Sequence, residues 1–169
     1  MKRFLSITVA LLLILCGCQF SDRIEHPVRF YYVRQADRFV YGSGDGVITY
    51  EERDAAGHEA DLRYLLSLYL QGPLDEGLRS PFPPECKLLT MSNKDRTVTL
   101  VLSESFADLS GLDRSLAYAC LGYTCANLDT IETMHILVLN KSKQVILDET
   151  ISIPSLLPPE VTPSTEANQ

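Results

Sequence analysis

The sequence lacks the excess of basic residues on which binding to nucleic acid or to an anionic lipid surface depends. Its 22 acidic residues outnumber the 15 basic ones, which gives a net charge of −7. The first 17 residues hold two of the basic residues and no acid, so the rest of the chain carries −9. The composition therefore argues against nucleic acid as a partner.

Familiar catalytic and metal-binding motifs are also missing. No CxxC motif or pair of histidines accompanies the cysteines, and no serine lies in a GxSxG motif. His58-Glu59 begins like the zinc motif HExxH, but Leu62 stands where the second histidine belongs. The sequence therefore gives no motif-based indication of a zinc site or a serine hydrolase, and we expect no cofactor.

A long apolar run is absent as well, because the one at residues 7–15 is too short to span a bilayer. Lys2 and Arg3 precede it, which is the pattern of a signal peptide over residues 1–17. The run ends in Leu15-Cys16-Gly17-Cys18, which resembles a bacterial lipobox, where the last cysteine receives the lipid. We therefore expect a lipid anchor on Cys18 at the extracytoplasmic face of the cell membrane, since a diacyl group suffices for stable anchoring. The alternative is an ordinary secretory signal that is cut elsewhere.

Three further cysteines, Cys86, Cys120 and Cys125, raise the question of a disulfide in an extracytoplasmic protein. Cys120 and Cys125 lie five residues apart in a predicted helix, so their side chains point away from each other. We favour small core residues, with a bridge from Cys86 to one of the other two as the alternative.

The chain is long enough for one ordinary domain. Residues 18–27 are short, polar and without pattern, and they are predicted to form a tether behind the anchor. The domain is expected over residues 28–153. Residues 154–169 are rich in Pro, Ser, Thr and Glu, which predicts a disordered tail.

Two helices and several strands are predicted within the domain. Leu62, Leu65, Leu66 and Tyr69 share one helical face, and Gly72-Pro73 ends that helix; a second helix is expected at about residues 113–127. Alternating or β-branched segments indicate strands at 28–33, 47–52, 87–91, 97–103 and 133–139, with an irregular one at 145–153. The order β-β-α-β-β-α-β predicts an α+β domain with one mixed sheet, covered on one face by the two helices.

The best candidates for catalysis are four carboxylates near the first hairpin: Asp37, Asp45, Glu51 and Glu52. A pair such as Asp45 and Glu52 would serve a small cell-envelope hydrolase of the glycosidase type. Because the whole chain is acidic, we favour a solvated acidic surface instead.

Four segments together resemble the GerMN domain, the module of GerM-type lipoproteins of spore formation. They are LLSLYLQGP at 65–73, GL.SPFP at 77–83, TVTLVLSESF at 97–106 and TMHILVLN at 133–140, and the resemblance covers residues 28–147. It implies a fold like that of ring-building domains. It also implies a lipid-anchored, extracytoplasmic protein of Gram-positive cells without known catalytic residues.

The resemblance further implies a role in building a cell-envelope complex of sporulation or germination. The implied partners are envelope proteins and the membrane that holds the anchor. We expect no small-molecule substrate and no enzymatic activity.

A stiff, turn-rich bridge follows the first predicted helix, and it contains Gly72, Pro73, Gly77, Pro81 and Pro83. Such a bridge suits either the rim of an active site or an architectural joint. Proline fixes φ, and glycine permits a sharp reversal of the chain. With the resemblance in view, we interpret the bridge as a joint that sets how the helix leads into the next hairpin.

Overall fold

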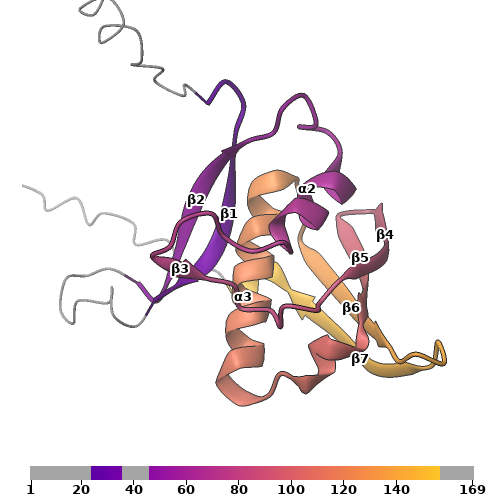
Figure 1. Ribbon diagram of the computed structural model, residues 1–169. Coiled ribbons are helices and arrows are strands. Elements are labelled where there is room, and N and C mark those ends of the chain that lie inside the picture. The colour runs from indigo at the N-terminus through magenta and orange to yellow at the C-terminus, as the bar shows by residue number, and fades with distance from the viewer. Residues whose placement is uncertain (1–23, 36–45, 157–169) are drawn as a thin grey trace, which may run out of the picture.

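The computed structural model describes residues 24–35 and 46–156 and shows two sheets with helices between them (Figure 1). The predicted anchor Cys18 lies outside the described residues, as do Asp37, Asp45 and residues 157–169 of the predicted tail. Residues 154–156, the start of that predicted tail, are described and lie at a short 3-10 helix. The predicted domain limits, residues 28–153, stay a prediction.

The chain runs through seven strands, two α-helices and two short 3-10 helices in the described residues. These are β1 (Pro27–Arg34), β2 (Ile48–Asp54), α2 (Leu62–Tyr69), β3 (Leu78–Arg79), β4 (Leu88–Lys94), β5 (Thr97–Ser103), η2 (Glu104–Asp108), α3 (Gly111–Leu128), β6 (Thr133–Leu139), β7 (Val145–Ser152) and η3 (Ile153–Ser155). The predicted α+β class is confirmed, and the predicted elements occur in the predicted order. The two-residue strand β3 is an addition, and the segment at 145–153, which is predicted as an irregular strand, forms β7.

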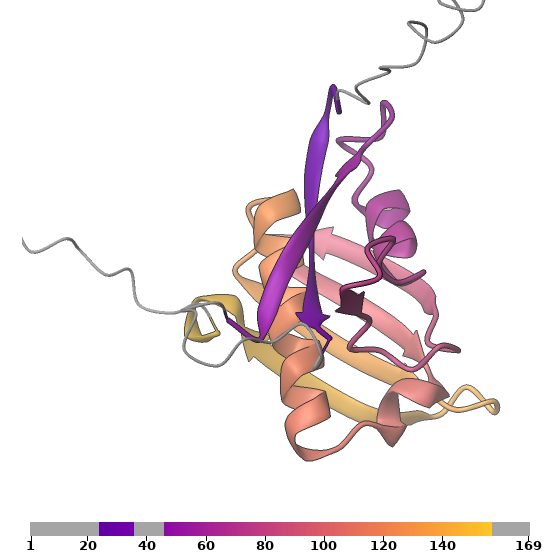
Figure 2. The same ribbon diagram turned by 60° about the vertical axis from the view of Figure 1, so that its left-hand side comes forward.

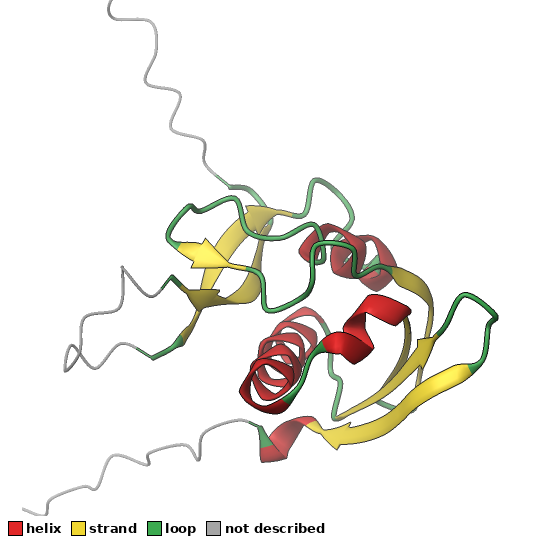
Figure 3. Ribbon diagram, turned by 60° about the horizontal axis from the view of Figure 1, so that its bottom comes forward, coloured by secondary structure: helices red, strands yellow, loops and turns green. Residues whose placement is uncertain are grey.

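The larger sheet has four strands in the order β4-β5-β6-β7. It is mixed, because β5 and β6 run parallel while both outer pairs are antiparallel. α3 makes the crossover that a parallel pair requires. Alternate residues of β5 and β6 point inward and are buried, namely Val98, Leu100, Leu102, Met134, Ile136 and Val138. Both helices lie on this inner face (Figure 3), as predicted for a mixed sheet.

The first hairpin does not join that sheet, and here the prediction of a single sheet is corrected. β1 and β2 form a long twisted hairpin (Figure 2), paired from Pro27↔Asp54 to Val33↔Ile48. β3 pairs with the end of β1, so the smaller sheet has the order β2-β1-β3. α3 lies between the two sheets (Figure 3).

Side chains of the helices satisfy one edge of β1, which explains why no strand of the larger sheet pairs there. The Tyr31 amide donates to Thr124 Oγ1 at 3.0 Å, and the Arg29 amide donates to Asn127 Oδ1 at 3.2 Å. The Tyr69 hydroxyl of α2 donates to the Tyr31 carbonyl at 2.8 Å. Buried backbone groups need such partners, and here helices supply them.

A row of four aromatic rings connects β1 of the smaller sheet to η2, the short helix that follows β5 of the larger sheet. The ring centroids of Phe30 and Tyr69 are 5.6 Å apart, those of Tyr69 and Phe82 are 5.5 Å apart, and those of Phe82 and Phe106 are 6.2 Å apart. All four residues belong to the single core cluster. The two sheets therefore share one core.

α2 begins at a capping residue and buries the face that the sequence predicts. Asp61 caps α2, because its carboxylate accepts from the Tyr64 amide at 2.9 Å. The predicted α2 face is confirmed, since Leu65, Leu66 and Tyr69 are buried.

Among residues 24–35 and 46–156, no helix has the length and apolar composition needed to cross a bilayer.

Candidate functional site

A buried ion pair at the end of β2 lies against the bend that follows α2. The side chains of Arg53 and Glu51 are only 7% and 10% exposed, and Arg53 Nε donates to Glu51 Oε1 at 2.6 Å. Arg53 also lies 5.3 Å from the centre of the Phe30 ring. Charges buried to this degree need partners, and each supplies one for the other.

Both members of the pair also bind the backbone of the bend. Arg53 Nη2 donates a hydrogen bond to the Gly72 carbonyl. The Glu51 carboxylate accepts from the Leu74 and Asp75 amides, each at 3.0 Å. The bend is thus fixed at three backbone groups within four residues.

Gly72 has the left-handed conformation that the sharp reversal requires, with φ of +94°. Leu70 caps α2, so Gly72 is the second residue beyond the cap, and its amide donates to the Tyr69 carbonyl at 3.1 Å. A Cβ at this position would meet only the Ser80 Cβ, at 3.9 Å. The need for glycine here is therefore conformational rather than steric.

The rest of the bridge is tied to the smaller sheet and to the core. The Gly77 amide donates to Asp75 Oδ1 at 2.7 Å, and the Gly77 carbonyl accepts from the Gln35 amide at 2.9 Å. Pro81 and Phe82 are buried, whereas Pro83 is half-buried. Phe82 anchors the bridge to Tyr69 of α2.

A groove of about 510 Å³ opens beside the bend. Pro73 and Leu74 line it on one side, and Ile24 and Leu68 contribute further apolar wall. Leu74 is 78% exposed, more than any other large hydrophobic residue that the structure describes. The residues around Leu74 give the groove apolar side chains and a backbone held by hydrogen bonds. The polar atoms of Glu51 and Arg53 are already used in bonds within the fold. The arrangement is suited to binding.

The predicted carboxylates do not converge in the described residues. Glu51 is committed to Arg53 and to the bend, whereas Glu52 points to the other face of β2 and pairs with Arg29, Nε to Oε1, at 3.0 Å. Asp37 and Asp45 lie outside the described residues. Within 24–35 and 46–156 there is also no group of three or more His, Cys, Asp or Glu side chains arranged to hold a metal ion.

Cys86, Cys120 and Cys125 are free and buried, in agreement with the prediction of small core residues. Burial raises the pKa of each thiol to about 12. The neutral thiol is not a nucleophile, so these cysteines are unreactive in the folded protein.

Four residues with a role here are not among the predicted site residues, namely Arg53, Phe82, Leu74 and Thr124. Arg53 and Glu51 share one face of β2, and that i, i+2 spacing of opposite charges was the available signal. Phe82 stands between two prolines, where an aromatic residue is unexpected in an exposed loop. Helical spacing places Thr124 on the buried stripe of the second predicted helix but does not show that its hydroxyl reaches β1, and nothing local in the sequence marks Leu74.

Comparisons with known proteins agree with this architecture. A family model described as Germane, sporulation and spore germination, matches residues 29–144. The chain is similar to the tandem GerMN domains of the sporulation protein GerM from Bacillus subtilis, at 19% identity and a TM-score of 0.50, over 75% of this chain and 44% of that one. It thus spans less than half of that structure.

A second solved structure, a candidate lipoprotein from Clostridium perfringens, matches at 24% identity and a TM-score of 0.43, over 67% of this chain and 75% of that one. No curated protein sequence matches the chain. The family match runs from β1 to the β6–β7 turn and includes both helices and the bend after α2. The chain therefore belongs to the Germane family of sporulation and spore germination.

Proposed function

We propose that the protein is a non-catalytic lipoprotein, anchored through Cys18 at the extracytoplasmic face of the cell membrane. In this proposal it is a binding component of a cell-envelope complex in sporulation or germination, and its partner is another envelope protein. Family membership supports the process. The signal-peptide pattern and the lipobox-like Leu15-Cys16-Gly17-Cys18 support the location.

The observation that carries the binding role is the presentation of Leu74. The residue is 78% exposed, while its amide is held by the buried carboxylate of Glu51. Because the backbone at Leu74 is already fixed, this residue loses little conformational freedom when a partner binds, so more of the contact energy becomes affinity. Leu74 beside its apolar groove is the surface that we assign to the partner.

Chain length limits where this groove lies relative to the membrane. Ile24 lines the groove and follows Cys18 by six residues, a stretch that spans at most about 20 Å when extended. An anchor on Cys18 therefore keeps the groove close to the bilayer. This position supports a membrane-associated partner rather than one that acts far from the membrane.

Substitution of Leu74 tests the binding surface. We expect Leu74→Ser to remove the envelope proteins that crosslink to the anchored protein in sporulating cells, with an unchanged melting temperature. Leu112→Ser is the matched control, because Leu112 is 74% exposed at the start of α3. Equal losses in both variants, or no loss with Leu74→Ser, would contradict the proposed surface.

Substitution of Cys18 tests the anchor separately. We expect Cys18→Ala to move the protein from the membrane fraction to the soluble extracytoplasmic fraction with the domain still folded. Retention on salt-washed membranes that also resists release by signal-peptide processing would rule out lipidation at Cys18 and leave the Leu74 surface to be judged on its own.

A further inference from the structure

A second groove, of about 550 Å³, lies where the parallel strands β5 and β6 end. Leu89 and Leu139 give it an apolar wall. Three exposed acidic residues surround that wall, namely Glu85, Glu104 and Asp108. None of the three carboxylates has an ion-pair partner among the residues that the structure describes, and Lys141 is the one cation in the lining.

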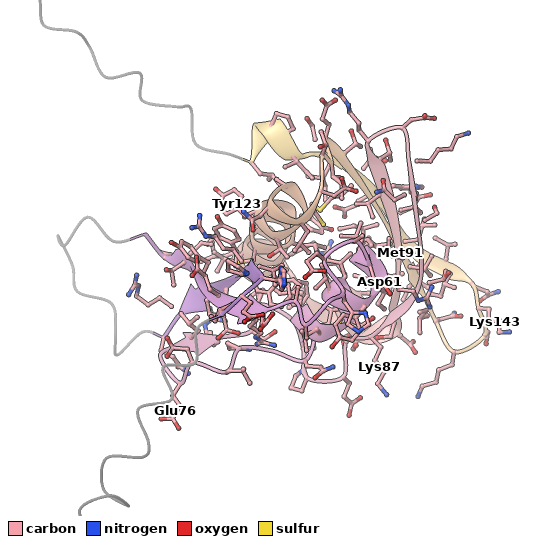
Figure 4. The ribbon with its side chains drawn as sticks, turned by 90° about the horizontal axis from the view of Figure 1, so that it is seen from above. Asp61, Glu76, Lys87, Met91, Tyr123 and Lys143 are labelled. Atoms are coloured by element: carbon pink, nitrogen blue, oxygen red, sulfur yellow. The ribbon has the colours of Figure 1, made fainter. Side chains whose placement is uncertain are left out.

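The β6–β7 hairpin tip beside this groove has the opposite character. Lys141 and Lys143 are exposed there, and Val145 and Ile146 follow with 54% and 46% of their surface exposed. Lys143 stands at the far end of the tip, away from the body of the domain (Figure 4).

The tip is ordered before it meets any partner. The Asn140 side-chain oxygen accepts from the Ser142 and Gln144 amides, both at 2.9 Å. The Lys143 amide donates to the Asn140 carbonyl at 2.9 Å, and Lys143 has a φ of +61°. Little freedom is left for association to remove.

We propose that two copies of this chain pair through these features, with the hairpin tip of each copy in the acidic groove of the other. The acidic groove and the basic tip adjoin in one chain, so a two-fold axis beside them closes both contacts together. Lys143 of one copy then faces Glu104 and its acidic neighbours in the second copy. One exposed apolar residue of β7, Ile146, covers the apolar wall at Leu89.

Charge favours a second copy of this chain as the occupant of the acidic groove over residues 157–169 and over a lipid surface. Residues 157–169 of the chain contain no lysine or arginine, so they do not complement the acidic groove. An anionic lipid surface is repelled by the same carboxylates. The contact is small and its charges are exposed, so the pairing is weak and sensitive to salt. It uses a different surface from Leu74 and does not depend on the proposed function.

Sedimentation of the mature chain, with Cys18→Ala to prevent lipidation, tests the proposal. A dimer is expected to accumulate as the concentration rises toward about 1 mM and to dissociate in about 1 M salt, in keeping with a small, charged interface. A wild-type chain that stays monomeric over this range would overturn the pairing.

Charge reversal makes the test specific. Lys143→Glu and Glu104→Lys are each expected to weaken dimerisation at least about tenfold, because like charges then face each other in both contacts. An equimolar mixture of the two variants should dimerise again, since a mixed pair has one native contact and one reversed but attractive contact.

Lys94→Glu is the control, because Lys94 is also exposed but ends β4, beside the β4–β5 turn. It should leave dimerisation unchanged, and circular dichroism should show all the variants folded. A mixture no better than either variant alone, or an equal loss with Lys94→Glu, would overturn the assignment of this surface.

Discussion

Arg53 is a residue whose charge serves the fold. Its guanidinium is buried between Glu51, the Gly72 carbonyl and the Phe30 ring, so it links β2 to the bend after α2. A buried ion pair adds little net stability compared with apolar residues, but removal of one member leaves the other charge without compensation. The pair therefore specifies the position of the bend.

Arg53→Met is expected to lower the free energy of unfolding by about 3–5 kcal/mol, because the Glu51 carboxylate is left buried and unpaired. The double variant Glu51→Leu, Arg53→Met should recover much of that loss, since no lone charge remains. Urea titrations of the three proteins measure both effects. A single variant within about 1 kcal/mol of wild type would show that water reaches the pair.

Gly72→Val should cost more than the ordinary ~1 kcal/mol of a surface substitution, because a β-branched residue is forced to a φ of +94°. An added Cβ meets only the Ser80 Cβ, at the ordinary contact distance of 3.9 Å, so backbone strain is the main cause of the expected loss. Pro73→Ala is the milder control, since it mainly restores freedom to the unfolded chain. Thermal melts would count against the joint if Gly72→Val proved as stable as wild type.

Cys125 links stability to alkaline pH. Burial raises the pKa of its thiol from 9.0 to about 12. Above pH 9 the unfolded chain therefore loses the thiol proton while the folded protein keeps it, so stability is full below pH 9 and falls as pH rises toward 12. Unfolding free energies measured from about pH 8 to pH 11 should show this fall, with a shallower slope in Cys125→Ala. An identical slope in the variant would assign the effect to other groups.

At the scale of elements, α3 acts as a partner for the edge of β1. A strand edge normally pairs with another strand, but the Tyr31 amide donates to the Thr124 hydroxyl instead. Thr124 is fully buried, so its hydroxyl is the acceptor available to that amide. The helix thereby holds the first hairpin apart from the larger sheet.

Thr124→Val keeps the shape of the side chain and removes the acceptor. We expect a loss of about 1–3 kcal/mol, because the Tyr31 amide is left unsatisfied in a partly buried position. The Tyr31 amide should also exchange its hydrogen faster. Ser115→Ala is the control, since the exposed Ser115 hydroxyl only donates to the Gly111 carbonyl of its own helix. Similar losses in the two variants would argue against a special role for Thr124.

At the scale of the molecule, one core supports both sheets. Leu100 lies in the centre of β5 and is only 1% exposed. Leu100→Ala should lower the free energy of unfolding by about 2–5 kcal/mol, the usual range for an emptied leucine site. Leu112→Ala, at a 74% exposed leucine, should change it by less than about 0.5 kcal/mol. Calorimetry should show one transition, and two separate transitions would mean that the sheets do not share a core.

The class of the fold and most of its elements follow from local patterns in the sequence. Alternation of apolar residues identified β5 and β6, and the i, i+3, i+4, i+7 spacing identified the buried face of α2. The turn chemistry at Gly72 was readable for the same reason, because a positive φ is a local property that glycine serves best.

The arrangement of the hairpins and the burial of particular polar groups depend on contacts between distant parts of the chain. Periodicity shows which face of a strand is buried, but it does not show which other strand or helix covers the edge. The split into two sheets therefore depended on Thr124 and Asn127, which reach β1 from about a hundred residues away. Likewise Glu51 and Glu52 are equivalent acids in the sequence, and only their opposite directions from β2 place Glu51 against buried Arg53 and Glu52 beside Arg29 at the surface.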